Sequence, residues 1–140
     1  MNDKEANAQK RRVLHHFNKW RSILRLQGWN IVHVWHREPR PPDEGQPSDW
    51  GAIADVKALW PYRQARINWF LPTVADVTDG ELEEHVAHEL VHILVNETRE
   101  EGADWLKHEE RVVTEIAWAF VALERSKHNA STRKESPKER

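Results

Sequence analysis

The sequence predicts one α+β domain with an N-terminal helix, a three-stranded, mainly antiparallel sheet, and two C-terminal helices. Apolar residues recur at three- and four-residue spacing in three segments, which is typical of helices with one buried side. Between the first two of these segments, three short runs rich in β-branched and aromatic residues are typical of strands. The expected helices are 4–27, 79–95 and 105–125, and the expected strands are 29–36, 50–60 and 65–71.

The first helix is indicated by Val13, Phe17, Trp20 and Leu24, which fall on one side of a helix. Lysine and arginine residues occupy its other faces, and such a run usually marks a solvated surface. Gly28 comes next, and glycine is common just past the last helical turn because it adopts the left-handed conformation without strain. We therefore expect this helix to stop at Gly28.

Prolines mark the borders of the strand segments. Pro61 and Pro72 end the second and third strands, and a proline-rich loop over 38–48 precedes the second. Three short strands with such connections favour an antiparallel meander. The third strand, 65–71, is expected to run directly into the next helix, and at an edge of the sheet it would hold an extended peptide.

The start of the second helix is marked by a capping box. Thr78 and Glu81 have the S/T-x-x-E spacing in which each side chain accepts a hydrogen bond from the backbone N–H of the other residue. Acidic residues fill the first turn, where they suit the positive end of the helix dipole. An apolar interior follows, so the helix is expected to run to about Val95.

Within this helix, His88-Glu89-Leu90-Val91-His92 reads H-E-x-x-H. Residues four apart lie one turn above each other on a helix, so His88 and His92 direct two imidazoles to one point. Zinc binds neutral imidazole at about 2.0–2.1 Å and prefers a tetrahedral set of ligands. Glu89 lies beside that point, where a carboxylate can accept a proton from the water that zinc activates. The alternative interpretation is a charged helix face with two surface histidines.

A catalytic zinc site usually has three protein ligands, so one more must come from outside this helix. Glu110 is favoured because Thr114 and Ala117 follow it on one stripe of the last helix. A small residue lets two helices approach, and a hydroxyl can hold a ligand in place. Glu109 lies nearer the centre of the apolar stripe, where a carboxylate needs a partner such as a metal. The predicted ligands are therefore His88, His92 and Glu110, with Glu109 or His108 as alternatives to Glu110.

The motif at 88–92, followed by Glu110 to Ala117, resembles the minimal gluzincin metallopeptidases. It is similar to the ImmA/IrrE family and to small zinc peptidases encoded in phage genomes. Over roughly residues 60–124, the resemblance implies a zincin-like fold, zinc as the cofactor, Glu110 as the third ligand and Glu89 as the general base. Thr114 departs from the family pattern, which has Asp or Asn there. The SprT-like peptidases are a nearby alternative, with a histidine ligand at a spacing close to that of His108.

Other polar residues are assigned less specific roles. Tyr62, His85 and His108 are candidates for donating a hydrogen bond to the oxyanion of peptide hydrolysis. His33 and His36 fall on the first strand, where a half-exposed histidine is commoner than a metal ligand.

Composition excludes several classes of protein. The chain has no cysteine, which excludes disulfides and cysteine-bound zinc, and its net charge of −2 gives no strong attraction for nucleic acid or membranes. No apolar run approaches the length of a membrane span and the first residues do not resemble a secretory signal, so a cytoplasmic location is expected. The expected partner is a peptide or protein substrate. The rival hypothesis is a zinc-binding interaction module of the same fold without turnover.

One domain is expected to cover residues 1–125. The remaining segment, 126–140, is rich in lysine and arginine and has no apolar periodicity. We expect it to be a disordered basic tail.

Overall fold

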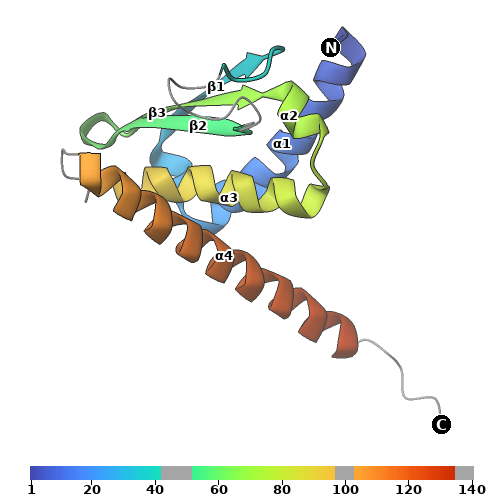
Figure 1. Cartoon of the computed structure of the whole chain (residues 1–140). Helices are drawn as coiled ribbons and strands as arrows, with labels where there is room; N and C mark the ends of the chain where they lie inside the picture. Colours follow the sequence, from blue (N-terminus) through green and yellow to red (C-terminus); the bar gives the residue numbers. More distant parts are fainter. Residues whose placement is uncertain (42–51, 97–102, 135–140) are drawn as a thin grey trace.

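The computed structural model describes residues 1–41, 52–96 and 103–134, with side chains except those of 103–108 and 129–134. These residues form a mixed α+β domain with four α-helices and one three-stranded sheet, which confirms the predicted class (Figure 1). The helices are α1 (Asp3–Ile23), α2 (Leu71–Ala75), α3 (Asp79–Val95) and α4 (Ala103–Lys134), and the strands are β1 (Asn30–His36), β2 (Ala54–Leu59) and β3 (Gln64–Phe70).

Helix α1 starts at a capping box, in which Asn2 and Glu5 exchange hydrogen bonds with each other's backbone N–H. The prediction that Gly28 ends the helix is wrong by more than one turn. The helix ends at Ile23, and Arg25 takes the left-handed conformation with φ 56°. A short 3₁₀ turn, η1 (Leu26–Gly28), then leads into β1. The Arg21 guanidinium donates to the carbonyl oxygens of residues 26, 27 and 29, which holds this irregular exit together.

The sheet is mixed, and the predicted antiparallel meander is wrong. The strand order is β1-β3-β2, with β1 parallel to β3 and β2 antiparallel to β3. Strand β3 is therefore central and does not form an edge, because both of its sides are hydrogen-bonded. Its composition accounts for this position, since Ile67 and Trp69 are fully buried while β2 carries exposed Lys57 and Leu59.

The sequence suggested that the third strand runs directly into the next long helix, but β3 and α3 are separated by a further helix. The short helix α2 follows β3 at once, with Pro72 in its first turn. Proline fits the first turn of a helix because the N–H that it lacks has no partner inside the helix there. The proline that was expected to end the strand therefore lies in the first turn of a helix. The predicted capping box then starts α3, with Thr78 and Glu81 exchanging hydrogen bonds.

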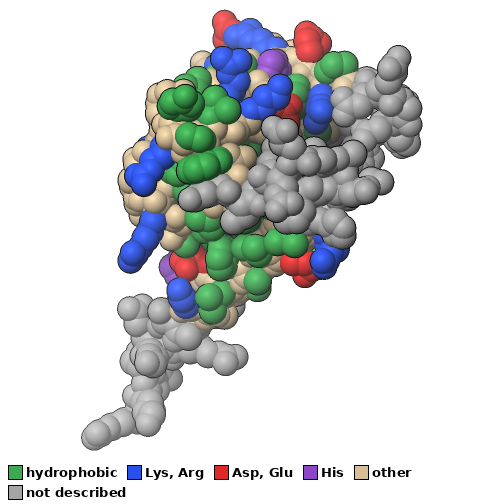
Figure 2. Space-filling model, turned by 90° about the vertical axis from the view of Figure 1, so that its left-hand side faces the viewer, with side chains coloured by type: hydrophobic (Ala, Val, Ile, Leu, Met, Phe, Trp, Pro, Cys, Tyr) green, Lys and Arg blue, Asp and Glu red, His purple; other side chains and the backbone are tan. Residues whose placement is uncertain are grey.

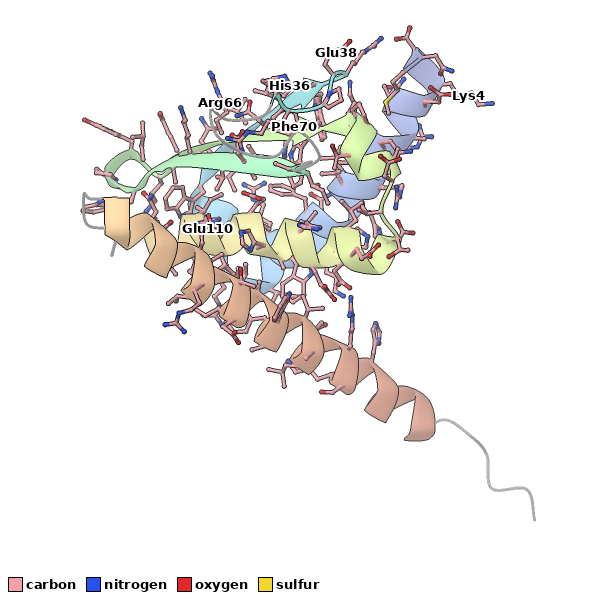
Figure 3. The ribbon with its side chains drawn as sticks, in the orientation of Figure 1. Lys4, His36, Glu38, Arg66, Phe70 and Glu110 are labelled. Atoms are coloured by element: carbon pink, nitrogen blue, oxygen red, sulfur yellow. The ribbon has the colours of Figure 1, made fainter. Side chains whose placement is uncertain are left out.

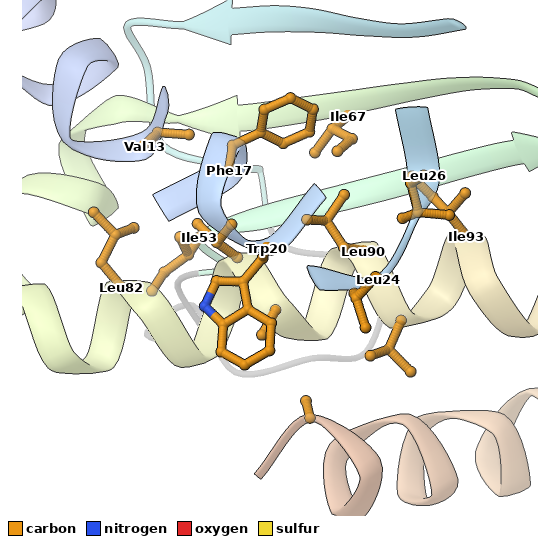
Figure 4. Packing of buried hydrophobic residues seen from close by; sticks show 14 of the residues in the cluster. Val13, Phe17, Trp20, Leu24, Leu26, Ile53, Ile67, Leu82, Leu90 and Ile93 are labelled. Atoms are coloured by element: carbon orange, nitrogen blue, oxygen red, sulfur yellow. The ribbon is translucent and has the colours of Figure 1, made fainter. Parts of the chain in front are cut away.

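Helix α3 is the centre of the packing. It contacts α1, β2 and α4, so its side chains face three directions (Figure 1). The side facing α1 and the sheet is apolar and fully buried, with Leu82, Val86, Leu90 and Ile93 packed near Phe17, Trp20 and Ile67 (Figure 4). A helix buried on several sides is a rigid mount for side chains that must keep a fixed geometry.

Helix α4 packs on α3 through Val113, Ala117 and Val121, which are buried. It continues to Lys134, so the prediction of disorder from 126 onward is wrong for residues 126–134, and residues 135–140 lie outside the described part. The ion pair between Lys127 and Glu124 joins neighbouring turns of this extension. Within the described residues, no helix combines the length and apolar character that crossing a membrane requires.

Candidate metal centre

The two histidines of the motif point to the same place, as their spacing predicts. His88 and His92 lie one turn apart on α3, and their Nε2 atoms are 3.1 Å from each other. Two imidazole nitrogens approach this closely only if a proton or a cation lies between them, because two lone pairs repel each other. The histidines are half-buried, with 21% and 12% of their side chains exposed, so solvent can still reach one side.

Glu110 completes this cluster from α4, at the point where α4 crosses α3 (Figure 3). Its two carboxylate oxygens lie 3.4 Å from Nε2 of His88 and 3.1 Å from Nε2 of His92. Tetrahedral ligands at about 2.0–2.1 Å from a zinc ion lie about 3.3 Å from one another. The nearest atoms of the three groups are therefore about as far apart as ligands around one ion, with a different oxygen of Glu110 facing each histidine, and this His-His-Glu group could hold a metal ion.

The alternatives to Glu110 take other positions. Glu109 lies on the far side of His92, with its Oε1 3.0 Å from the His92 Nδ1, while the nitrogen that faces His88 and Glu110 is Nε2. Glu109 thus accepts a hydrogen bond from Nδ1–H and leaves Nε2 as the lone-pair donor. The side chain of His108 lies outside the described residues.

Thr114 plays the same part for the other histidine. Its Oγ1 lies 3.5 Å from Nδ1 of His88, so both imidazoles have an oxygen partner behind them. These partners fix the ring orientations and direct both Nε2 lone pairs at the same point. The expectation that the Thr114 hydroxyl supports a ligand agrees with this geometry.

The ionisable groups of the cluster shift one another's pKa values. Hydrogen bonds from His88 and His92 hold the pKa of Glu110 far below its usual range, so this group is a carboxylate at any ordinary pH. Burial lowers the pKa of His92, but its hydrogen bonds to Glu110 and Glu109 and the charge of Glu89 outweigh burial and raise it. The carboxylates that favour a proton on His92 would equally favour a cation there, so metal ions and protons compete for the cluster.

Glu89, the predicted base of the motif, is buried beside the histidines, with 7% of its surface exposed. Burial raises the pKa of its carboxyl to about 7, although the two histidines act in the opposite direction. Carboxylates with a pKa near neutrality are suited to accept and return a proton. Perturbed acids of this kind are common at functional sites, which makes the cluster a candidate site.

The cluster opens into a cleft of about 600 Å³. One wall is the start of β2 with the residues before it, the floor is α3, and the other wall is α4. The residues lining it are Ala52, Ile53, Ala54, Glu84, His85, His88, Glu89, Thr114, Ala117 and Trp118.

The other histidines and the tyrosine singled out in the sequence lie at different distances from the cleft. Of the proposed oxyanion donors, His85 lines the cleft, whereas Tyr62 is 74% exposed on the turn between β2 and β3 and is not among the lining residues. His33 and His36 lie on β1, away from the cluster. Trp69 donates its indole N–H to Nδ1 of His33 at 3.0 Å, and His36 is hydrogen-bonded to the side chain of Asn68.

Two parts of the cleft were missed by reasoning from the sequence. Trp118 lies one helical turn after Thr114, so it could have been found by extending the stripe from Glu110 by one further turn. The wall formed by residues 52–54 carried no signal, because small and apolar residues at a strand start look the same whether they face a cleft or a core.

Comparisons with known proteins do not add an assignment. No protein-family model, no curated protein and no solved structure matches the chain.

Proposed function

We propose that the protein is a zinc-dependent metallopeptidase of the gluzincin kind, with a zincin-like fold. One observation carries this proposal: the Nε2 atoms of His88 and His92 are 3.1 Å apart, the two carboxylate oxygens of Glu110 lie 3.1–3.4 Å from them, and Glu89 of the same motif is buried. Two imidazoles and one carboxylate are a donor set that zinc peptidases use, with one position left for water. The H-E-x-x-H resemblance supports the same assignment.

The residues around the cluster have distinct tasks in this proposal. Zinc, when bound to the two histidines and Glu110, acts as a Lewis acid on water and on the substrate carbonyl. Glu89 accepts the proton of the attacking water at a carboxylate oxygen and then donates it to the nitrogen of the leaving amine. His85, which lines the cleft, is the residue that we propose donates a hydrogen bond to the oxygen that becomes negative.

The edge of the sheet beside the cleft supports a peptide substrate. Strand β2, and not β3 as the sequence suggested, is an edge strand next to α3, and its first residue, Ala54, lines the cleft. Among the described residues, no strand pairs with the outer side of β2. An extended peptide can hydrogen-bond there and pass its backbone through the cleft.

The test is metal content and proteolysis measured on the same sample. The protein with zinc restored should contain about one zinc per chain and cleave an unstructured protein such as casein. Glu89→Gln should keep the zinc and lose at least about 100-fold in rate, because it removes a proton acceptor. Glu115→Gln, which changes an exposed glutamate of α4 outside the cluster, is the matched control and should cleave like the parent.

Two results would reject the proposal. If Glu89→Gln cleaves as fast as the parent, the assigned base is wrong. If the parent holds zinc tightly but cleaves nothing, the zinc-binding interaction module becomes the better assignment.

A further inference from the structure

The net charge of −2 conceals a strong segregation of charge along the chain. Residues 6–37 and 56–75 contain no aspartate or glutamate, yet they hold ten of the 21 lysine and arginine residues. Sixteen of the 23 acidic residues follow residue 75, on and around α3 and α4. The sheet and α1 therefore carry an excess of basic residues, whereas α3, which carries the two histidines of the cluster, has five acidic residues and no lysine or arginine.

The basic part has an exposed apolar centre at the turn between β2 and β3. There, 58% of Leu59, 46% of Trp60 and 74% of Tyr62 are exposed. Figure 2 views the molecule from this end and shows hydrophobic side chains with lysine and arginine beside them. We call this surface the turn patch, and it consists of Lys57, Leu59, Trp60, Tyr62, Arg63 and Arg66.

The cations of the turn patch have no acidic partner among the described residues. Other basic side chains of the domain do: Arg12 pairs with Asp79, and Lys19 pairs with Glu83. Lys57 and Arg66 are directly opposite each other on β2 and β3, and Arg66 lies on the face of the sheet away from α3 (Figure 3). Two like charges at a cross-strand pair destabilise a sheet, so the fold itself gains nothing from them.

Backbone strain points to the same end of the molecule. The two non-glycine residues with positive φ in the described residues are Arg63, at 48°, and Arg25, at 56°. Glycine or asparagine would adopt this conformation at lower cost. The two turns are adjacent, because the carbonyl of Arg63 accepts a hydrogen bond from Asn30 and its guanidinium lies over Gly28. Backbone strain that does not stabilise the fold is typical of functional surfaces.

We propose that the turn patch binds an acidic segment of a partner protein, one that also carries a large apolar side chain. Tryptophan, tyrosine and arginine are the residues most enriched at the energetic centres of protein interfaces, and all three are exposed here. Carboxylates supply the charge that the unpaired guanidinium and ammonium groups lack, and arginine binds them with two parallel hydrogen bonds. The apolar side chain of the partner covers Leu59 and Trp60. Binding needs no metal, so this inference is independent of the proposed function.

A short acidic segment fits better than nucleic acid. A nucleic acid strand extends its charge well beyond one turn, and α3, which packs on β2, carries five acidic residues that repel it. A short segment interacts only with charges within about 8–10 Å at physiological salt. Leu59 also offers an aliphatic surface, which contributes little to base stacking.

The experiment measures fluorescence anisotropy with a labelled peptide of repeated Glu-Glu-Phe-Gly units at about 0.15 M salt. The peptide should bind saturably, with a Kd below about 1 mM. Arg63→Gly should weaken binding about tenfold or more, yet leave Tm unchanged or raised, because glycine relieves the positive φ. Trp60→Ala should weaken binding to a similar extent. Arg11→Gln, which removes an exposed cation of α1 outside the patch, is the control and should bind within about twofold of the parent.

Several outcomes would overturn the inference. They are the absence of saturable binding, a normal Kd for Arg63→Gly, or equal binding of a peptide with glutamine in place of glutamate. Tighter binding of an oligothymidine, lost in the same variants, would assign the turn patch to nucleic acid instead.

Discussion

Zinc added to the metal-free protein is expected to raise Tm by about 9 °C at a free concentration 100 times its Kd. Binding to the folded state alone then adds about 2.7 kcal/mol of stability. Unfolding entropy of about 2.1 cal/mol/K per residue, over a chain of 140 residues, gives about 0.3 kcal/mol for each degree of Tm. The estimate assumes that the cluster exists only in the folded state, which holds because two of its ligands lie on α3 and one on α4.

The assay is a thermal melt followed by circular dichroism, with and without zinc, on the parent and on single variants. His88→Ala, His92→Ala and Glu110→Ala should each lose most of the zinc-dependent shift, because each removes one of three ligands. His85→Ala is the matched control, since it removes a histidine of the same helix that is outside the cluster and should keep the shift. Comparing shifts rather than absolute Tm values removes the effect of each substitution on the metal-free fold.

Two results would refute this reasoning. A shift below about 2 °C in the parent at saturating zinc would show that the three donor groups do not bind the ion as a set. A full shift in Glu110→Ala would remove Glu110 from the ligands and return the choice to Glu109 or His108.

Three further substitutions test the support of the site and of the core. Glu109→Gln should keep the fold but weaken zinc binding about 10–100-fold in a chelator competition, because it alters the partner of His92 Nδ1. Glu83→Gln should flatten the dependence of unfolding free energy on pH in acid. Burial raises the pKa of Glu83, but its hydrogen bonds from Lys19 and Trp20 outweigh burial and lower it. The carboxylate therefore stabilises the fold above its unfolded pKa, and this stabilisation is lost as the pH falls through its folded pKa. An unchanged slope of unfolding free energy against pH would contradict this. Leu90→Ala should cost about 2–5 kcal/mol in urea denaturation, since Leu90 is fully buried, and a loss below about 1 kcal/mol would show that the core refills the space.

The parts of the fold that follow from short-range physics were predictable from the sequence. The Thr78 capping box and the apolar interior of α3 act within a few residues, so the helix was expected over 79–95 and is found there. The spacing of His88 and His92 likewise fixes their relative position through helix geometry alone. Glu110, which was favoured among three neighbours, lies with the two histidines among the described residues, and the side chain of His108 lies outside them.

The features that were predicted wrongly depend on contacts between segments that are distant in the sequence. Strand pairing is decided by which strand can be buried on both sides, and the alternation of residues in β3 does not reveal that Phe70, on its outer face, is also covered. The end of α1 could not be predicted because Arg25, and not Gly28, adopts positive φ there. The Arg21 side chain then donates hydrogen bonds to the carbonyl groups of the residues that follow Arg25. The role of Glu109 was equally hidden, since a buried carboxylate next to a metal site can serve as a ligand or hold one.

The attachment of α4 to the rest of the domain has a further consequence. Among the described elements, α4 packs substantially on α3 alone, along one stripe of small and medium apolar residues. A segment held by one neighbour opens as a unit at lower cost than the rest of the fold, and its amide hydrogens then exchange with solvent earlier. An ion shared between α3 and α4 raises the cost of that opening. Metal supply would thus control how often the wall of the cleft on α4 is in place, in addition to the reactivity inside the cleft.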